Sequence, residues 1–265
     1  GGSDITSMAM KSSCGVCVAG ACGMYSKFSR HATCAAALLF ALACSSALPW
    51  RNEPIGEEVN LVFTVKNNLL YLASATIDGH QGRFLIGSAQ PRTVLDAKFA
   101  EAVDGTAHSL QLNTRETLRF APVIADLRGI GDGIVGADVW GGHAVTIDYS
   151  SGLLTYQKEG MHPELMTVYK YADAPMINVI IDGRSTPTVV DTASPDTLVI
   201  PRLGTTADRR AARVQIAGTD FGNVDVRLAD VSAPRIGNRL LSRFLVSIDY
   251  GRRQIGLWRD PRIAL

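Results

Sequence analysis

The sequence lacks cysteine beyond residue 44, and it lacks an excess of charge of either sign. All five cysteines lie in the first 44 residues, so the rest of the chain must fold without disulfide bonds. The 26 Lys and Arg residues nearly balance the 25 Asp and Glu residues, and no basic run is longer than Arg209-Arg210 or Arg252-Arg253. The chain therefore offers no basic field for a phosphate backbone, and we expect no nucleic-acid partner.

Several motifs of metal and hydrolase chemistry are also missing. No His-Glu-x-x-His or Gly-x-Ser-x-Gly sequence occurs, which gives a zinc peptidase or an α/β serine hydrolase no support. The five histidines show no i, i+4 spacing, and we expect them at turns or in solvent. Cys14-x-x-Cys17 has no second ligand pair at zinc-site spacing. We therefore expect no metal and no cofactor.

One segment has the spacing of a dinucleotide-binding motif. Residues 131–136, GDGIVG, match Gly-x-Gly-x-x-Gly, but such a site must follow a strand and open a helix. The residues that follow, ADVWGGHAVTIDY, favour a turn and a strand instead. We expect a glycine-rich turn there, with Asp132 and Asp138 as turn residues.

The N-terminal part of the chain has the layout of an export signal. Residues 24–47 contain two basic residues, an apolar run over 32–43 and then small residues, as a secretory signal peptide does. The apolar run is too short to span a bilayer comfortably. We predict that residues 1–23 are an upstream leader or tag and that the protein is exported, either secreted or periplasmic. Cys44 leaves a lipid anchor open, although the residues before it fit a lipobox poorly.

Beyond residue 58 the chain consists of short apolar runs separated by Gly, Pro and Asp-Gly pairs. Alternating, β-branched runs predict strands, and Asp78-Gly79 and Asp182-Gly183 predict tight hairpin turns. The best helical candidates are residues 96–103 and 206–212. The fold is therefore predicted to be mostly β.

The chain contains an internal repeat. Residues 75–95 align without a gap on residues 179–199, at an offset of 104. A second match has an offset of 101: in each half a glycine is followed, twelve residues later, by the aspartate of an Ile-Asp-Tyr sequence. Two ordered matches indicate a tandem duplication. We place lobe 1 at residues 48–160 and lobe 2 at residues 161–265, and we expect the two matched aspartates, Asp148 and Asp249, to make strand-end hydrogen bonds.

The repeat contains a recognisable loop. In residues 188–197, TVVDTASPDT, an apolar strand ends in Asp-Thr-small-Ser, which resembles the active-site loop of aspartic peptidases of the retropepsin and pepsin type. The later Ile134-Val135-Gly136 and, less well, Arg235-Ile236-Gly237 also resemble that family, as do the two Ile-Asp-Tyr strands. The resemblance covers roughly residues 58–260. It implies the acid-protease fold, two tandem β-barrel lobes related by pseudo-twofold symmetry, with a peptide or protein as substrate and a monomer rather than a dimer.

The resemblance also implies roles for individual residues. Asp191 corresponds to a catalytic aspartate, and Thr192 would fix its loop by a hydrogen bond to the other lobe. The remaining loop-supporting residues are Ala193 and Ser194 in lobe 2 and Gly87, Ser88 and Ala89 in lobe 1. For substrate binding we predict two further residues, Asp196 on the exit of the loop and Phe221 in a flap-like hairpin over 214–231, whose lobe 1 counterpart is 108–123.

Gly87 departs from the aspartic-peptidase pattern at the position of a catalytic aspartate, and this bears directly on whether the protein can hydrolyse peptides. The family's mechanism needs two carboxylates about 3 Å apart that share one proton and polarise a water molecule. Gly87 has no side chain where lobe 2 has Asp191, and the hydroxyl of Ser88 does not ionise near neutral pH. Two hypotheses stay open. The protein hydrolyses peptides if a second carboxylate is supplied, by another copy of Asp191 or by Asp96 or Asp196, or it is a pseudopeptidase that binds an extended peptide or a protein partner between its lobes.

Overall fold

A computed structural model describes residues 58–103, 105–112, 117–157, 160–202 and 204–261. All of these residues belong to a compact unit that spans residues 49–265. The predicted leader and signal peptide, which together contain all five cysteines, lie outside the described residues, so export and lipid attachment at Cys44 stay predictions. Within the described ranges, no helix is both long enough and apolar enough to cross a membrane.

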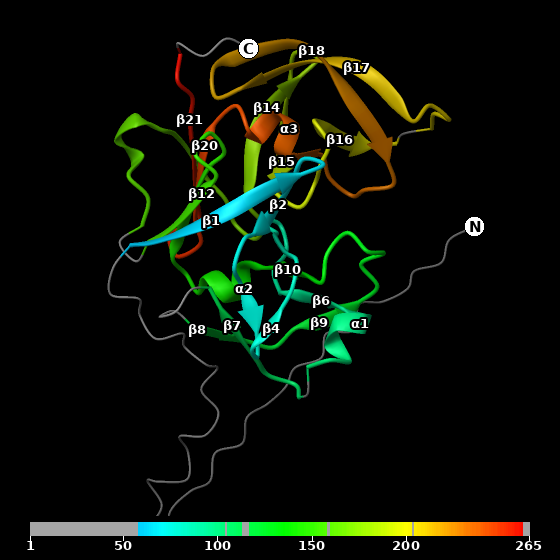
Figure 1. The fold of residues 1–265 in the computed structure, drawn as a ribbon. Helices are drawn as coiled ribbons and strands as arrows, with labels where there is room; N and C mark the ends of the chain where they lie inside the picture. Colours follow the sequence, from blue (N-terminus) through cyan, green and yellow to red (C-terminus); the bar gives the residue numbers. More distant parts are fainter. Residues whose placement is uncertain (1–57, 104, 113–116, 158–159, 203, 262–265) are drawn as a thin grey trace, which may run out of the picture. The chain divides into compact units, whose positions relative to one another are not determined.

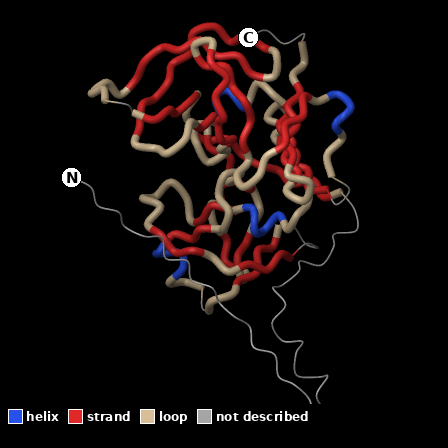
Figure 2. Tube along the Cα trace, turned by 180° about the vertical axis from the view of Figure 1, so that it is seen from behind, coloured by secondary structure: helices blue, strands red, loops and turns tan. Residues whose placement is uncertain are grey.

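Strands make up half of the described chain, which is mostly β as predicted, and the helices are single turns (Figure 2). The predicted helix at 96–103 is reduced to α1 (Ala97–Ala100), which the side chain of Asp96 caps. The predicted helix at 206–212 is wrong, because Arg209 begins a strand in which Ala212, Val214 and Ile216 are buried alternately. The other helical turns are α2 (Ala137–Trp140), η1 (Pro163–Leu165) and α3 (Asn238–Leu241).

Both lobes contribute to one eleven-stranded sheet, in the order β13-β21-β20-β11-β12-β1-β2-β5-β10-β6-β9 (Figure 1). Its lobe 1 strands are β1 (Val59–Lys66), β2 (Leu69–Leu72), β5 (Phe84–Ile86), β6 (Val94–Asp96), β9 (Val123–Ala125), β10 (Gly133–Val135), β11 (Ala144–Asp148) and β12 (Leu153–Gln157). Its lobe 2 strands are β13 (Thr167–Lys170), β20 (Leu245–Asp249) and β21 (Gln254–Trp258). The sheet therefore joins the two halves of the duplication.

The rest of lobe 2 forms a closed barrel, in the order β14-β15-β19-β16-β18-β17. Its strands are β14 (Met176–Ile181), β15 (Arg184–Val190), β16 (Leu198–Pro201), β17 (Arg209–Ile216), β18 (Thr219–Ala229) and β19 (Arg235–Ile236). In lobe 1 the corresponding strands are divided between one end of the large sheet and a four-stranded sheet. That second sheet contains β4 (His80–Gln81), β3 (Thr76–Ile77), β7 (His108–Gln111) and β8 (Thr117–Phe120).

The pairing of β11 with β20 locates the symmetry axis between the halves. The strands are antiparallel, with Ala144 opposite Asp249 and Asp148 opposite Leu245. Equivalent residues of the two repeats are 101 apart in this region, and Thr146 faces its own equivalent, Ser247. Their hydroxyl oxygens lie 2.9 Å apart. A pseudo-twofold axis therefore passes between these two side chains.

The Asp-Gly turns repeat in atomic detail. Asp78-Gly79 has φ values of 49° and 81°, and Asp182-Gly183 has values of 49° and 79°, as two-residue hairpin turns require. The carboxylate of the first accepts the backbone N–H of Ser109 at 2.8 Å, and that of the second accepts the N–H of Arg213 at 3.0 Å. Ser109 and Arg213 are themselves 104 apart, so the structure confirms the register of the repeat.

The core is continuous across both lobes, and its largest fully buried side chains include Trp140, Tyr156 and Phe84. The expectation that the histidines lie at turns or in solvent is wrong for His108, which lies in β7, whereas His143 closes a turn through its N–H to Trp140 O at 3.0 Å. His108 is 3% exposed, with Nδ1 2.6 Å from an Asp78 carboxylate oxygen. His143 is half-buried, and its ring packs on Tyr156. Burying a polar ring is tolerated in both places because a hydrogen-bond partner is present.

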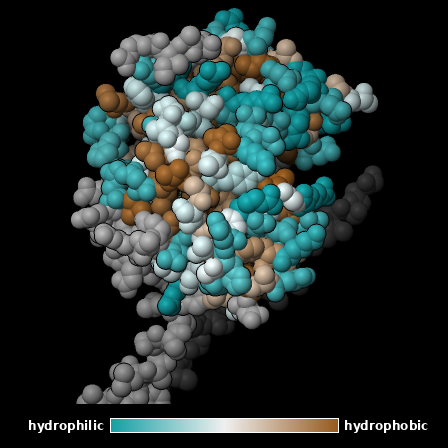
Figure 3. Space-filling model, in the orientation of Figure 1, coloured by the Kyte–Doolittle hydropathy of each residue, from teal (hydrophilic) through white to brown (hydrophobic). Residues whose placement is uncertain are grey.

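Surface apolar groups are concentrated in a few places. Val62 and Val65 on β1 are 56% and 54% exposed, and apolar surface appears in the region of β1 in Figure 3.

The two matched aspartates, Asp148 and Asp249, lie at the ends of β11 and β20. Their carboxylates accept backbone N–H groups from Ser150 and Arg252. These are the strand-end hydrogen bonds expected from the two Ile-Asp-Tyr sequences.

Candidate active site: the paired loops at Gly87 and Asp191

The two matched loops leave their strands in the same way. Gly87 follows β5 and its N–H donates to Val135 O at 2.9 Å, while Asp191 follows β15 and its N–H donates to Ile236 O at 3.0 Å. Each loop then closes with a four-residue β-turn, from Gln90 N–H to Gly87 O at 3.2 Å and from Ser194 N–H to Asp191 O at 3.1 Å. The backbone of the loop is therefore the same in both lobes, although only one carries a carboxylate.

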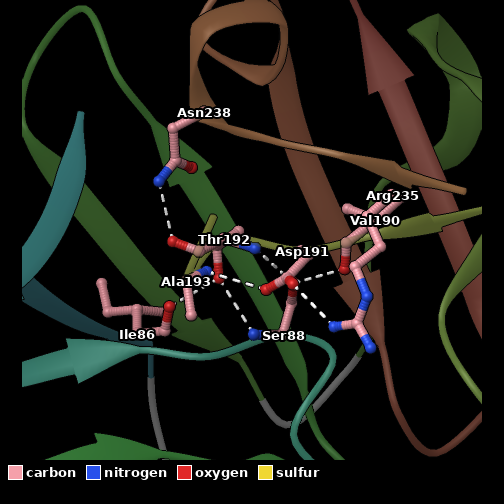
Figure 4. A network of polar contacts seen from close by, with 8 residues as sticks. All are labelled: Ile86, Ser88, Val190, Asp191, Thr192, Ala193, Arg235 and Asn238. Atoms are coloured by element: carbon pink, nitrogen blue, oxygen red, sulfur yellow. Dashed lines mark hydrogen bonds and ion pairs between the residues drawn. The ribbon is translucent and has the colours of Figure 1, made fainter. Parts of the chain in front are cut away.

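The loops hold one another through reciprocal hydrogen bonds (Figure 4). The N–H of Ser88 donates to Thr192 Oγ1 at 2.9 Å, and the N–H of Thr192 donates to Ser88 Oγ at 3.0 Å. Each hydroxyl also donates across the interface, Ser88 to Val190 O at 2.7 Å and Thr192 to Ile86 O at 2.6 Å. Both side chains are buried. The cross-lobe bond that the resemblance implied for Thr192 is present, and Ser88 mirrors it.

Asp191 lies beside this junction with both carboxylate oxygens engaged. The residue is 5% exposed. Its Oδ1 accepts the N–H of Ala193 at 3.0 Å, and its Oδ2 accepts from Nη1 of Arg235 at 3.0 Å (Figure 4). The arginine side chain is 36% exposed. The one carboxylate of the paired loops is thus part of an ion pair with an arginine.

We did not predict this role for Arg235 from the sequence. It occupies the first position of Arg235-Ile236-Gly237, the weaker of the two apolar-apolar-Gly matches, where lobe 1 has Ile134. β19 runs parallel to β15, with Arg235 opposite Val189, so a long side chain at this position reaches the end of β15. The available signal was a charged residue at a repeat position that is apolar in the other half.

Gly87, the lobe 1 equivalent of Asp191, has no room for a side chain in this structure. A Cβ atom on Gly87 would lie 2.4 Å from Cγ2 of Ile134, closer than such atoms can approach, and at a tight 3.1 Å from Cγ of Gln90. Ile134 is 7% exposed and packs in a small cluster with Leu69, Leu85 and Leu127. Lobe 1 therefore has isoleucine in the space that a side chain at position 87 would need, and lobe 2 has arginine bound to the side chain at position 191.

The other carboxylates considered as partners for Asp191 have different contacts. Asp96 caps α1 through Lys98 N–H and accepts the N–H of Leu127 at 2.9 Å, and this last hydrogen bond is the main cause that lowers the pKa of Asp96. Asp196 accepts from Arg227 Nε at 2.8 Å. Neither carboxylate is bonded to Asp191. The proposed contact of Asp196 with substrate stays a prediction.

Phe221 lies in the predicted hairpin, but not at its turn. The β17–β18 hairpin turns at Ala217-Gly218, with φ values of 49° and 77°, and not in the following residues. Phe221 lies within β18 and packs against Phe244, with ring centroids 5.7 Å apart. A register shift between Arg213 and Gln215 absorbs the Gly-containing stretch as an irregularity in the strand. A substrate contact for Phe221 remains untested. The tip of the lobe 1 hairpin, 113–116, lies outside the described residues.

The other expected features of the site can be placed as well. Residues 133–135 of the Gly-x-Gly-x-x-Gly segment form β10, and α2 begins directly after the segment at Ala137, so the expectation of a glycine-rich turn is wrong for these residues. A dinucleotide site needs its glycines in the turn between a strand and a helix, whereas here the segment itself contains the strand. Asp138 accepts three hydrogen bonds, from the Thr93 N–H, the Thr93 hydroxyl and the Val139 N–H. The described ranges contain no group of three or more His, Cys, Asp or Glu residues that could hold a metal ion.

The comparisons with known proteins agree with this architecture. No protein-family model and no curated protein sequence matches the chain. Among solved structures, the chain is similar to an aspartic proteinase from Irpex lacteus, with a TM-score of 0.51 and 11% sequence identity over 77% of this chain and 98% of that chain. An identity this low shows the fold alone. The fold is therefore mostly β and of the aspartic-proteinase type, as predicted.

Proposed function

We propose that this protein is a pseudopeptidase that binds an extended peptide without hydrolysing it. The observation that carries the proposal is the Asp191–Arg235 ion pair, because the carboxylate of Asp191 is bound to an arginine and not to a second carboxylate. Gly87, the residue opposite, has no side chain, and Ile134 fills the adjacent space. The proposed binding mode follows from the fold class, since proteins of this kind bind extended chains by main-chain hydrogen bonds and side-chain pockets.

The chemistry argues against hydrolysis by these residues. A carboxylate dyad works because one group is protonated while the other is not, so that the pair can give and take protons. A guanidinium stays protonated and has no acceptor atom, so Arg235 can neither share the proton of Asp191 nor receive one from water. The hydroxyl of Ser88 donates to Val190 O. Losing one member of a catalytic group commonly costs several powers of ten in rate.

A peptidase remains the second candidate, because the loop that carries Asp191 has the same turn and the same cross-lobe bonds that a working site would need. Hydrolysis would require another carboxylate to displace Arg235. A second copy of Asp191 is a poor source, because Ser88 and Ile86 of the same chain already bind the Thr192 side of this loop.

The test combines turnover with binding. Hydrolysis of a denatured protein is measured from pH 2 to pH 8 for the wild type, Asp191→Asn and, as a matched control at an ion pair outside the paired loops, Asp220→Asn. Binding of a random-sequence peptide pool is measured for the same proteins. We expect no turnover in any of them and unchanged binding in Asp191→Asn. Acid-dependent cleavage by the wild type that disappears in Asp191→Asn, but not in Asp220→Asn, would establish the peptidase instead.

A triple variant designed to restore a pair of carboxylates provides a second test. Gly87→Asp supplies a carboxylate, Ile134→Ala removes the atom that would overlap with it, and Arg235→Leu releases Asp191. We expect this triple variant to gain measurable acid hydrolysis if it folds, whereas Gly87→Asp alone should stay inactive. A folded triple variant without activity and without peptide binding would mean that the paired loops do not form a peptide site.

A further inference from the structure

A cavity of about 570 Å³ lies beside the lobe 1 loop. It is lined by residues 88–91 of that loop, by the start of α2, by most of the 171–175 connection between β13 and β14, and by Tyr250 and Arg253. Much of the lining is apolar, including Pro91, Ala137 and Pro175. A cavity of this size is in the range of small-molecule sites, about 300–1,000 Å³.

The other half of the duplication shows what fills the equivalent place. Asn238 follows the glycine of the lobe 2 apolar-apolar-Gly element and is 3% exposed. Its Nδ2 donates to Thr192 O at 2.8 Å and to Asn68 O at 2.6 Å. Its Oδ1 accepts from the hydroxyl of Tyr149 at 2.8 Å. One carboxamide thus satisfies a loop carbonyl, a turn carbonyl and a phenol at the same time.

Lobe 1 lacks that carboxamide. The residue equivalent to Asn238, at the offset of 101, is Ala137, which lines the cavity. The equivalent of Tyr149 is Tyr250, whose hydroxyl has only a long contact of 3.4 Å to Ser88 O, the carbonyl that matches Thr192 O. The hydroxyl of Tyr171, another lining residue, is buried and has no hydrogen-bond partner. An unpaired buried hydroxyl is costly, so a ligand acceptor that reached the Tyr171 hydroxyl beside this cavity would remove that cost.

The two phenols are donors at neutral pH. Burial, with a smaller contribution from the nearby Asp249, raises the pKa of Tyr171 to about 12. Burial also raises the pKa of Tyr250, and Tyr171 adds to that effect. Both hydroxyls therefore keep their protons and can donate to a carbonyl oxygen, while Ser88 O can accept from an N–H group.

We propose that this cavity binds a small molecule with a primary carboxamide on an apolar body. The carboxamide takes the place of the Asn238 side chain: its NH₂ donates to Ser88 O and its oxygen accepts from both Tyr250 and Tyr171. The apolar body lies against Pro91, Ala137 and Pro175. The site shares Ser88 with the paired loops but does not include Asp191 or Arg235, and the proposal does not rest on peptide binding there.

The probe is benzamide, with acetophenone as its matched control, because acetophenone keeps the ring and the carbonyl but has no N–H donor. Binding to the full chain is measured by calorimetry and by NMR of ring-labelled tyrosine. We expect saturable binding of benzamide, with shifted signals from Tyr171 and Tyr250, and binding of acetophenone weaker by about tenfold, the worth of roughly one hydrogen bond. Absence of saturable benzamide binding, or equal binding of acetophenone, would overturn the proposal.

Variants test the comparison with Asn238. Ala137→Asn supplies the missing carboxamide from the chain itself, so it should raise the melting temperature and abolish benzamide binding. Ala137→Leu fills space without polar groups, so it should weaken binding without the gain in stability. Tyr171→Phe should weaken binding by about threefold to tenfold and serves if neither Ala137 variant folds. Unchanged benzamide binding in Tyr171→Phe and in any folded Ala137 variant would refute the site.

Discussion

Lobe 1 and lobe 2 share a backbone at the paired loops but not a chemistry. Lobe 1 combines Gly87 with Ile134, and lobe 2 combines Asp191 with Arg235 at the equivalent positions. The turns and the reciprocal bonds of Ser88 and Thr192 are the same in both. The comparison teaches that this junction depends on hydroxyl and backbone groups, because it is complete in the absence of a carboxylate dyad.

The largest effect is expected from the reciprocal bonds themselves. Thr192→Val leaves the N–H of Ser88 and the carbonyl of Ile86 buried without partners, and Ser88→Ala does the same to Thr192 N–H and Val190 O. Each substitution should lower the free energy of unfolding by about 2–5 kcal/mol, since two buried groups lose their bonds. Urea unfolding followed by the fluorescence of the buried Trp140 measures it.

The control for this pair is Thr155→Val, which removes the more exposed hydroxyl that donates to Asn60. It should cost less than either junction variant. The symmetry of the junction further predicts similar losses for Thr192→Val and Ser88→Ala. If the losses in free energy of unfolding differed several-fold, the hydrogen bonds of one lobe would contribute most of the stability of the interface.

Overlap at Gly87 is expected to have the next largest effect. Gly87→Ala places a Cβ atom against Cγ2 of Ile134, and overpacking of this kind costs about 1–3 kcal/mol. Ile134→Leu moves the branch away while keeping the side-chain volume. The double variant should therefore be more stable than the sum of the single changes predicts, in a double-mutant cycle measured by urea unfolding. Simple additivity would show that Ile134 does not fill the space.

The ion pair of lobe 2 should respond differently from its apolar counterpart. Arg235→Leu leaves the buried carboxylate of Asp191 without its cation, and we expect a loss of about 1–2 kcal/mol, less than for a fully buried pair because the guanidinium is partly exposed. Adding Asp191→Asn should restore much of the loss. Thermal unfolding of the two single variants and the double variant decides this. If Arg235→Leu costs the same with aspartate as with asparagine at position 191, the two side chains are not coupled.

The smallest effect is expected at the surface of the lobe 2 barrel. The guanidinium of Arg213 and the N–H of Gly222 lower the pKa of Asp220 from 3.8 to about 2. Since the pKa is lower in the folded state, this contact stabilises the protein above about pH 4 and stops doing so as the pH falls toward 2. Asp220→Asn should thus lower the melting temperature slightly at pH 7 and not at pH 2. A difference in melting temperature between the wild type and Asp220→Asn that grows as the pH falls would contradict this prediction.

The sequence predicted the features that depend on local patterns. The register of the repeat, the two Asp-Gly turns and the position of the paired loops follow from short residue strings with a fixed backbone requirement. The Arg235 contact could not be predicted in this way, because 44 residues separate it from Asp191 and only the parallel pairing of β15 with β19 brings the two together. The start of β17 has the composition of a helix because its first residues are helix formers, whereas its pairing with β14 and β18 determines its conformation.

The meeting of Thr146 with Ser247 on the symmetry axis has an evolutionary consequence. In a homodimer built from one such lobe, every substitution would appear on both sides of the axis, so an aspartate bound to an arginine would always face its own copy. Joining two lobes in one chain removes that constraint. Each half could then acquire its own residues at equivalent positions while the hydroxyls at the axis, one threonine and one serine, continued to join them.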